Sequence, residues 1–408
     1  MKVFHQHVFA NGLKVIHEPS PTNVVYCGYI VSAGTRNEDA PDFGMAHFCE
    51  HTTFKGTSRR KSWHVRNSLE RVGGDLNAFT NKEVTVYYAT VQKEDFARAV
   101  DLLSDIVFHS TYPQREIDKE VEVIIDEIDS YNDSPAELIY DEFEEMLFRG
   151  HGLGRNILGT ADRLREYTTR DALRFTGKYY VPNNVTVFIL GQVDFDHAVR
   201  LIERHVGDLA PSDDLHREFQ PLPLYEVEER VCERDTYQAH VLMGNRGCSS
   251  QDKNRTALFL LNNILGGPGM NSLLNVSLRE KHGLVYNVES SSFSYQDTGV
   301  WSVYFGCEET KVDKCRKLVL NELDTLCSSL LSPQRLSMAK KQLTGQILIA
   351  GDNFESYALA MGKTYALSGR HRDVDAICEQ IRALSAQELR DVAQSVFNPD
   401  NLTTLIYK

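Results

Sequence analysis

One block of sequence occurs twice in this chain, and the repeat restricts the folds that its 408 residues can adopt. The two copies, residues 164–186 and 381–403, lie 217 positions apart. Each copy opens with a capping-box pattern, at Thr168 or at Ser385, and continues through a helical period to a proline and a β-branched run. Because all of these features recur at one offset, they predict two duplicated halves of about 200 residues each.

The patterns outside the repeated block predict both strands and helices. Apolar positions recur at helical spacing in residues 96–107 and 117–128. Strands are expected at Val3–Phe9 and Leu13–Ile16, which flank the hairpin signal Asn11-Gly12, and at Val24–Val31 and Val84–Val91.

These elements predict an α+β protein with two structurally repeated α/β sandwich domains, each a mostly antiparallel sheet packed with helices. The domains are expected at residues 1–208 and 225–408, joined by a Pro-rich linker at residues 209–224. The sequence has neither regular βαβ alternation nor a GxGxxG motif, which argues against a doubly wound nucleotide-binding fold.

The charge balance and the cysteines narrow the class of protein. The formal net charge is −13, so general binding of nucleic acid is not expected, and a preference for basic peptides is a hypothesis resting on this charge alone. No apolar run has the roughly 18 to 20 residues of a membrane helix, so membrane association is not expected. The eight cysteines form no CxxC, and no leader pattern opens the sequence, which predicts reduced thiols in a cytoplasmic protein.

The motif with the strongest chemistry is His47-Phe48-Cys49-Glu50-His51. On a helix, positions i and i+4 share one face, so His47 and His51 can take two corners of a zinc tetrahedron. Glu50 would then lie beside the metal, where a general base acts on a bound water molecule. This is the HxxEH order, the reverse of HExxH. The alternative is an exposed polar helix that carries two histidines by chance.

A catalytic zinc ion usually needs a third protein ligand. Glu120 and Glu127 are seven residues apart on the helix expected near residues 117–130, so both can lie on one side of it. The alternative for this segment is a solvated acidic face.

The segment from Gly44 to Thr57, GMAHFCEHTTFKGT, resembles the signature of the pitrilysin family of metallopeptidases, which includes insulin-degrading enzyme and mitochondrial processing peptidase. Further matches at residues 73–80 and 158–160 extend the resemblance over nearly the whole chain. The family fold, a duplicated two-domain repeat, agrees with the predicted duplication.

The resemblance also implies roles for individual residues. His47, His51 and Glu127 would bind one Zn²⁺ per chain, and Glu50 would be the general base. Glu120 matches an acid that supports the ligands without binding the metal. Cys49 replaces the Leu of many relatives and should face away from the two histidines.

The second half of the chain has no copy of the metal motif. Aligning Gly44-Met45 with Gly269-Met270 places Ser272, Asn275 and Val276 where the first half has His47, Glu50 and His51. In the resembled family an Arg and a Tyr seven residues later reach the active site from this half.

Arg279 and Tyr286 match that pair. They would orient the substrate chain and stabilise the oxyanion; the alternative is a surface Arg and a buried strand Tyr. The Gly-rich turn at residues 266–272 lacks the GK[ST] ending of a phosphate-binding loop.

The segment with Asn77, Ala78 and Phe79 is expected at a sheet edge. Relatives pair extended substrates with such an edge; a purely structural strand is the alternative.

Together these features predict a zinc endopeptidase that cleaves peptides or unfolded segments inside a clamshell chamber. A chain with two domains would supply half of that chamber, so a homodimer is expected, with a heterodimer of related chains as the alternative. The competing functions are a non-catalytic scaffold or partner subunit of the same fold, and a peptide-binding protein without turnover.

Overall fold

The computed structural model describes residues 3–213, 215, 219–234 and 236–408. The chain forms two compact units, each assembled from three segments. The first unit contains Met1–Ser130, Arg155–Pro221 and Ala350–Asp373, and the second contains Tyr131–Gly154, Leu222–Ile349 and Val374–Lys408. The predicted domains are residues 1–208 and 225–408. Residues 131–154, predicted in the first domain, belong to the second unit, and residues 350–373, predicted in the second domain, belong to the first unit. The predicted linker, 209–224, includes residues 214 and 216–218, which lie outside the described part.

The first unit is built on a six-stranded sheet in the order β1-β2-β6-β3-β5-β4. Its strands are β1 (His5–Val8), β2 (Lys14–Glu18), β3 (Val24–Val31), β4 (Asp75–Thr80), β5 (Thr85–Gln92) and β6 (Val185–Leu190). All neighbours are antiparallel except β2 and β6. The predicted hairpin is confirmed: Gly12, at φ 86°, donates its N–H to Phe9 O over 2.9 Å.

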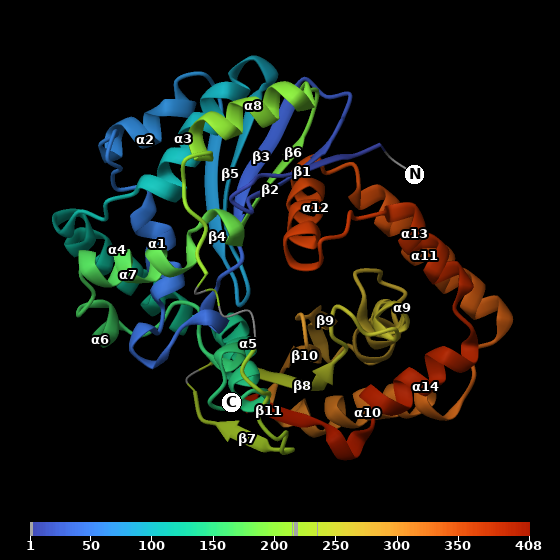
Figure 1. Ribbon diagram of the computed structural model, residues 1–408. Coiled ribbons are helices and arrows are strands. Elements are labelled where there is room, and N and C mark those ends of the chain that lie inside the picture. Colours follow the sequence, from blue (N-terminus) through green and yellow to red (C-terminus); the bar gives the residue numbers. More distant parts are fainter. Residues whose placement is uncertain (1–2, 214, 216–218, 235) are drawn as a thin grey trace. The chain divides into compact units, whose positions relative to one another are not determined.

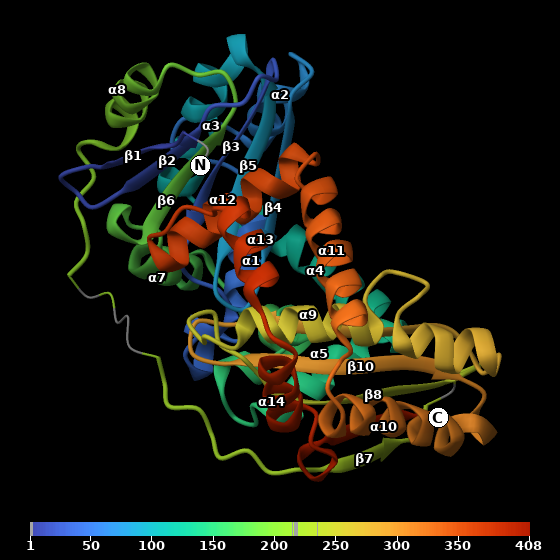
Figure 2. The same ribbon diagram turned by 90° about the vertical axis from the view of Figure 1, so that its right-hand side faces the viewer.

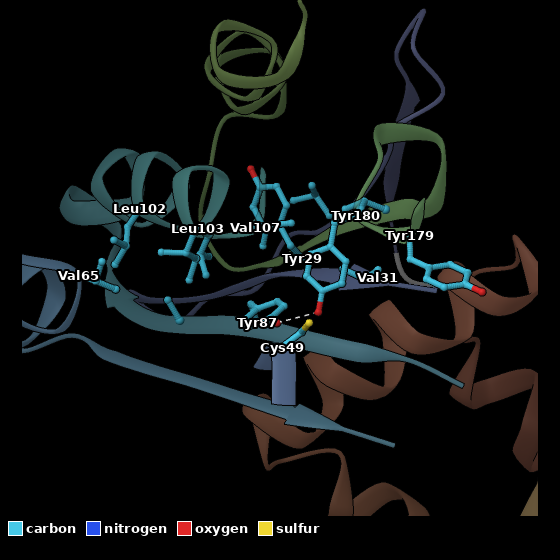
Figure 3. Packing of buried hydrophobic residues seen from close by; sticks show 14 of the residues in the cluster. Tyr29, Val31, Cys49, Val65, Tyr87, Leu102, Leu103, Val107, Tyr179 and Tyr180 are labelled. Atoms are coloured by element: carbon cyan, nitrogen blue, oxygen red, sulfur yellow. Dashed lines mark hydrogen bonds between the residues drawn. The ribbon is translucent and has the colours of Figure 1, made fainter. Parts of the chain in front are cut away.

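One face of this sheet carries most of the helices of the first unit. Their apolar stripes and the sheet residues Tyr29 and Tyr87 form a single buried core, part of which is drawn in Figure 3. These helices are α1 (Met45–Thr53), α2 (Ser62–Glu70), α3 (Phe96–His109), α4 (Gln114–Asn132), α7 (Thr169–Tyr179) and α8 (Phe195–Val206). A short helix, α6 (Ala161–Leu164), precedes α7.

The opposite face is covered by α12 (Phe354–Ser368), which packs on β6, β3 and β2 (Figure 1). The helix lies very close to the strands at Gly362, where a Cβ atom would be 2.7 Å from Phe188 Cδ1 and 2.8 Å from Ile30 Cδ1. Glycine is therefore required for this approach.

The second unit repeats the topology of the first. Its strands are β7 (Glu229–Cys232), β8 (Ala239–Gly247), β9 (Val285–Ser294), β10 (Gly299–Cys307) and β11 (Thr403–Tyr407). Their order, β7-β11-β8-β10-β9, corresponds to the order β2-β6-β3-β5-β4 in the first sheet. The parallel pairs also correspond, β7 with β11 and β2 with β6. The helix α14 (Ala386–Val396) lies 217 residues after α7 at both ends. The predicted duplication and fold class are confirmed.

Helices cover both faces of the second sheet as well. One face packs with α9 (Arg255–Gly266), α10 (Val312–Ser328) and α14, together with α13 (Val374–Ala383) and α11 (Pro333–Ala350). The other face packs with α5 (Pro135–Leu147) through Ile139 and Phe143. Figure 2 labels β7, β8 and β10 of this sheet together with α5, α10 and α14. Helix α5, from the first half of the sequence, thus covers the second sheet, and α12, from the second half, covers the first sheet.

The alignment of Gly44-Met45 with Gly269-Met270 is wrong. In the first unit the helix after β3 is α1, which packs on α7 and β4; in the second unit the helix after β8 is α9, which packs on α14 and β9. The counterpart of α1 is therefore α9. Ser272, Asn275 and Val276 follow α9, in a turn and in the π-helical turn Asn275–Lys281. Helix α9 contains no His, Cys, Asp or Glu, so the second half still lacks the metal motif.

Two further predictions concern membranes and thiols. No helix in the described residues combines the length and the apolar character needed to cross a membrane. All eight cysteines are free, as expected, and six of them are buried.

Candidate metal centre

Helix α1 places the HxxEH motif with one side in the core and the other toward α4. Met45, Phe48 and Cys49 are buried in the apolar cluster, and Figure 3 shows Cys49 in that core. Because Cys49 points into the core, the expectation that it faces away from His47 and His51 is confirmed.

Both ends of α1 are fixed by buried hydrogen bonds. At the start, the Glu38 carboxylate accepts from Gly44 N over 2.9 Å and from Ala46 N over 2.8 Å, while burial raises the pKa of Glu38 to about 8. At the end, Thr53 Oγ1 lies 3.2 Å from Tyr112 OH and accepts from Tyr87 OH over 3.2 Å. The backbone that carries the histidines is therefore held independently of any metal.

The structure brings His47, His51 and Glu127 together, and we call these three residues the His–His–Glu cluster. One ligand atom from each lies within 4.8 Å of the other two. Glu127 Oε2, from α4, is 3.4 Å from His51 Nε2 and 3.8 Å from His47 Nε2. No other group of three or more His, Cys, Asp or Glu side chains among the described residues has such an arrangement.

Glu120 and Lys55 hold the ring of His51. Glu120 Oε1 is 3.1 Å from His51 Nδ1, and Glu120 Oε2 is 2.5 Å from Lys55 Nζ. With Nδ1 engaged by a carboxylate, Nε2 of His51 is directed to the cluster. His47 differs, because its Nδ1 is buried and makes no hydrogen bond to any described residue.

The cluster has a distinctive charge distribution. Burial would lower the pKa of His51, but hydrogen bonds to Glu120 and Glu127 outweigh it and raise this pKa to about 9. Burial, with the charge of His51, lowers the pKa of His47. The hydrogen bond to His51 lowers the pKa of Glu127 despite partial burial. At pH 7 the cluster therefore holds one imidazolium, one neutral imidazole and one carboxylate.

Glu50 lies beside the cluster. Its Oε2 accepts a hydrogen bond from Thr80 Oγ1 over 2.6 Å, and the side chain is buried. Burial raises the pKa of Glu50, although Thr80 and His51 oppose the shift. A carboxyl group with a raised pKa exchanges protons more readily near neutral pH.

The cluster fits a zinc ion. Bonds of about 2.0 to 2.1 Å to a tetrahedral ion place ligand atoms about 3.3 Å apart, close to the two separations from Glu127. Two imidazoles and one carboxylate are a common catalytic zinc set, and they leave a fourth position open. The opposed pKa shifts also keep Glu127 ionised and His47 neutral, the forms that bind metal.

The predicted substrate strand lies at an edge. Asn77, Ala78 and Phe79 are in β4, the last strand of the first sheet, and β4 pairs only with β5 among the described strands. Thr80 joins the end of this strand to Glu50. The edge position is thus confirmed, and its use by a substrate stays a prediction.

Arg279 and Tyr286 belong to the second unit and are not part of the cluster. Arg279 lies in the π-helical turn and Tyr286 on β9; the guanidinium carbon is 5.7 Å from the centroid of the Tyr286 ring. Tyr286 is 83 % exposed, so the alternative of a buried strand tyrosine is wrong. Their predicted catalytic role stays a prediction.

The sequence interpretation missed five residues that support the site: Lys55, Thr80, Glu38, Tyr112 and Tyr87. Lys55 lies four residues after His51, but α1 ends at Thr53, so the spacing is only a partial signal for this contact. The other four gave no such signal, because they reach α1 through tertiary packing.

Two family models match the chain. The model described as Insulinase (Peptidase family M16) matches residues 14–161, and the model described as Peptidase M16 inactive domain matches residues 167–343. The chain belongs to peptidase family M16. The resemblance to the pitrilysin family is thereby confirmed. The first match contains every residue of the His–His–Glu cluster, and the second contains α9, which lacks ligands.

Similar proteins match nearly the whole length of the chain. It is 31 % identical over 400 residues to the uncharacterized zinc protease YmxG of Bacillus subtilis, covering 97 % of this chain and 96 % of that protein. It is 30 % identical to an uncharacterized zinc protease of Rickettsia bellii, with 99 % and 97 % covered. A protease structure from Helicobacter pylori has a TM-score of 0.91 at 22 % identity, with both chains fully covered.

Proposed function

We propose that this M16 chain is a zinc-dependent endopeptidase that hydrolyses peptides or unfolded segments. The observation that carries the proposal is the His–His–Glu cluster with Glu50 beside it. When bound to this cluster, Zn²⁺ supplies Lewis-acid polarisation of the scissile carbonyl. The names of the relatives, uncharacterized zinc proteases, support the same chemistry.

The protein's own residues would perform the proton transfers. Glu50 takes a proton from the attacking water molecule and delivers it to the leaving amine, and Thr80 keeps the carboxylate in place over 2.6 Å. Glu120 keeps His51 in the tautomer whose Nε2 faces Glu127. Arg279 and Tyr286 would orient the substrate and stabilise the oxyanion.

The extended substrate would pair with the free edge of β4. Such pairing uses the backbone N–H and C=O groups of Asn77, Ala78 and Phe79, so it accepts many sequences. Because Thr80 follows these residues and contacts Glu50, a peptide on this edge would run past the general base.

We further propose that two copies of the chain enclose the substrate in a clamshell chamber. The first unit supplies the metal cluster and the second supplies Arg279 and Tyr286, so one chain type contains every predicted site residue. The free thiols suit a reducing compartment, which supports a cytoplasmic location. An active monomer in size-exclusion chromatography would contradict the dimer.

The replacement Glu50→Gln tests the peptidase proposal. It should lower the cleavage of a quenched-fluorescent peptide by about 10²-fold to 10⁴-fold, because proton transfer is lost. Bound zinc, measured by elemental analysis, should stay near the wild-type amount. Glu122→Gln, on an exposed position of α4, is the control and should change neither quantity.

Hydrolysis that survives Glu50→Gln would refute the role of Glu50. A wild-type protein that binds zinc and peptide without cleavage would favour the peptide-binding alternative. Absence of both zinc and peptide binding would favour the scaffold.

A further inference from the structure

The face of the first sheet that carries α12 continues onto β5 and β4. In an antiparallel pair, residues opposite each other point to the same face; Asn77 is opposite Tyr88, and Phe79 is opposite Val86. On β3, Ile30 is opposite Val86 and contacts the Gly362 region of α12. Phe79 and Tyr88 therefore lie on the α12 face, and both are only half-buried.

Side chains from α12 border this aromatic pair. The rings of Phe79 and Tyr88 meet edge to face, with centroids 6.3 Å apart. Lys363 Nζ lies 5.9 Å from the Phe79 centroid, and Glu355 accepts a hydrogen bond from Tyr88 OH over 3.1 Å. The site thus combines an aromatic surface with one ammonium group and with one carboxylate, that of Glu355, which is engaged by Tyr88 OH.

The ammonium of Lys363 has no carboxylate partner in the described structure. The nearby Glu83 already forms a 2.9 Å salt bridge with Arg36. Lys363 is half-buried, and burial lowers its pKa although the charge of Glu83 opposes the shift. A partly desolvated ammonium that contacts an aromatic ring but no carboxylate can accept an anionic partner from a bound ligand.

A peptide on the β4 edge would reach both faces of the sheet. Ala78 packs toward the core beneath α1, and Thr80, on the same side of the strand, contacts Glu50. Because successive side chains of an extended peptide alternate between faces, every second one would project toward Phe79 and Lys363.

We propose that Phe79, Tyr88 and Lys363 form a specificity subsite for an Asp or Glu side chain of the bound peptide. The proposal rests on the proposed peptidase function and names one preference of that site. It opposes the expectation from the net charge of −13, which favours basic peptides throughout. The charge of Lys363 determines the preference at this position, because salt screens the exposed charges of the protein that lie farther than about 8 to 10 Å from the bound side chain.

The experiment is a positional scan in the zinc-loaded protein. Quenched-fluorescent peptides of one sequence carry Gln, Glu or Lys at each successive position, and kcat/KM is measured for each. We expect Glu to exceed Gln about tenfold at one position and show no advantage at the two adjacent positions. Lys at the preferred position should be cleaved more slowly than Gln.

Variants of Lys363 assign the preference. Lys363→Met keeps the apolar stem and should equalise Glu and Gln; Lys363→Glu should favour Lys at the same position. Lys363→Arg keeps the charge and should keep the preference for Glu. Lys93→Met removes an exposed lysine elsewhere in the first unit and should leave the ratio at its wild-type value.

Binding to Glu50→Gln protein separates this inference from the peptidase proposal. Fluorescence anisotropy with the same peptides should show the same preference in Kd, and adding Lys363→Met should remove it. Cleavage without any Glu preference, or a preference that survives Lys363→Met, would overturn the subsite while the peptidase proposal stands. Glu-selective binding without cleavage would support the subsite and overturn the peptidase proposal.

Discussion

Zinc binding by this protein should release one proton at neutral pH. The pKa of His51 in the metal-free cluster is raised to about 9, whereas the pKa of His47 and of Glu127 is lowered. A metal ion needs the neutral imidazole of His51, so it must displace that proton. Since pH 7 lies about two units below this pKa, the apparent zinc affinity should be about 100-fold weaker at pH 7 than well above pH 9.

The sign and the slope of this effect can be measured. Between pH 6 and pH 8 the apparent Kd should fall about tenfold per pH unit, as measured by competition with a zinc chelator of known pH dependence. Calorimetry in buffers of different ionisation enthalpy should give about one proton released at pH 7. An affinity that is independent of pH over this range, with no proton release, would refute a protonated His51.

Glu120→Gln separates the two contributions of Glu120. It removes a carboxylate that favours the charged form of His51, so the pKa of His51 should fall. The pH above which the apparent zinc affinity stops rising should therefore be lower than in the wild-type protein. It also loosens the orientation of the ring, so affinity above that pH should fall about 10-fold to 100-fold. Glu122→Gln, on an exposed position of the same helix, should reproduce the wild-type curve.

Two matched pairs of substitutions test the fold, with thermal and urea unfolding as the measurement. Gly362→Ala should destabilise the protein by about 1–3 kcal/mol because the new methyl group would meet Phe188, whereas Gly345→Ala, with open space around it on α11, should stabilise it by about 0.5–1 kcal/mol. Thr168→Ala and Ser385→Ala remove equivalent helix caps and should each cost about 1 kcal/mol. A harmless Gly362→Ala would contradict the close packing of α12, and caps that differ widely in cost would contradict their equivalence.

Local patterns predicted the repeated elements well. The strand at Val24–Val31 and the 217-residue shift from α7 to α14 agree with the structure at both ends. The pairing of His47 with His51 also follows from helix geometry alone, since i and i+4 share a face. Assigning Glu127 to the same cluster required the family resemblance, because helix periodicity does not say which helix packs beside which.

The errors and omissions all concern tertiary packing between segments of the chain. Gly44 lies at φ 86° before α1, whereas Gly269 lies in a turn after α9, so a shared Gly-Met pair did not mark equivalent helices. Likewise, the apolar stripes of α5 and α12 show that each helix needs a sheet, but they do not show which one. The contacts of Glu38 to α1 are tertiary and left no periodic signal.

The origin of α12 late in the sequence has a consequence for synthesis on the ribosome. Strand β6 is complete at Leu190, but α12 begins only at Phe354, so Phe188 and Ile30 lack their cover while residues 191–353 are made. At about 5–20 residues per second this interval lasts roughly 10 to 30 seconds. One apolar face of the first sheet therefore stays exposed to solvent until nearly the whole chain has been synthesised. During this interval the nascent protein most needs a chaperone.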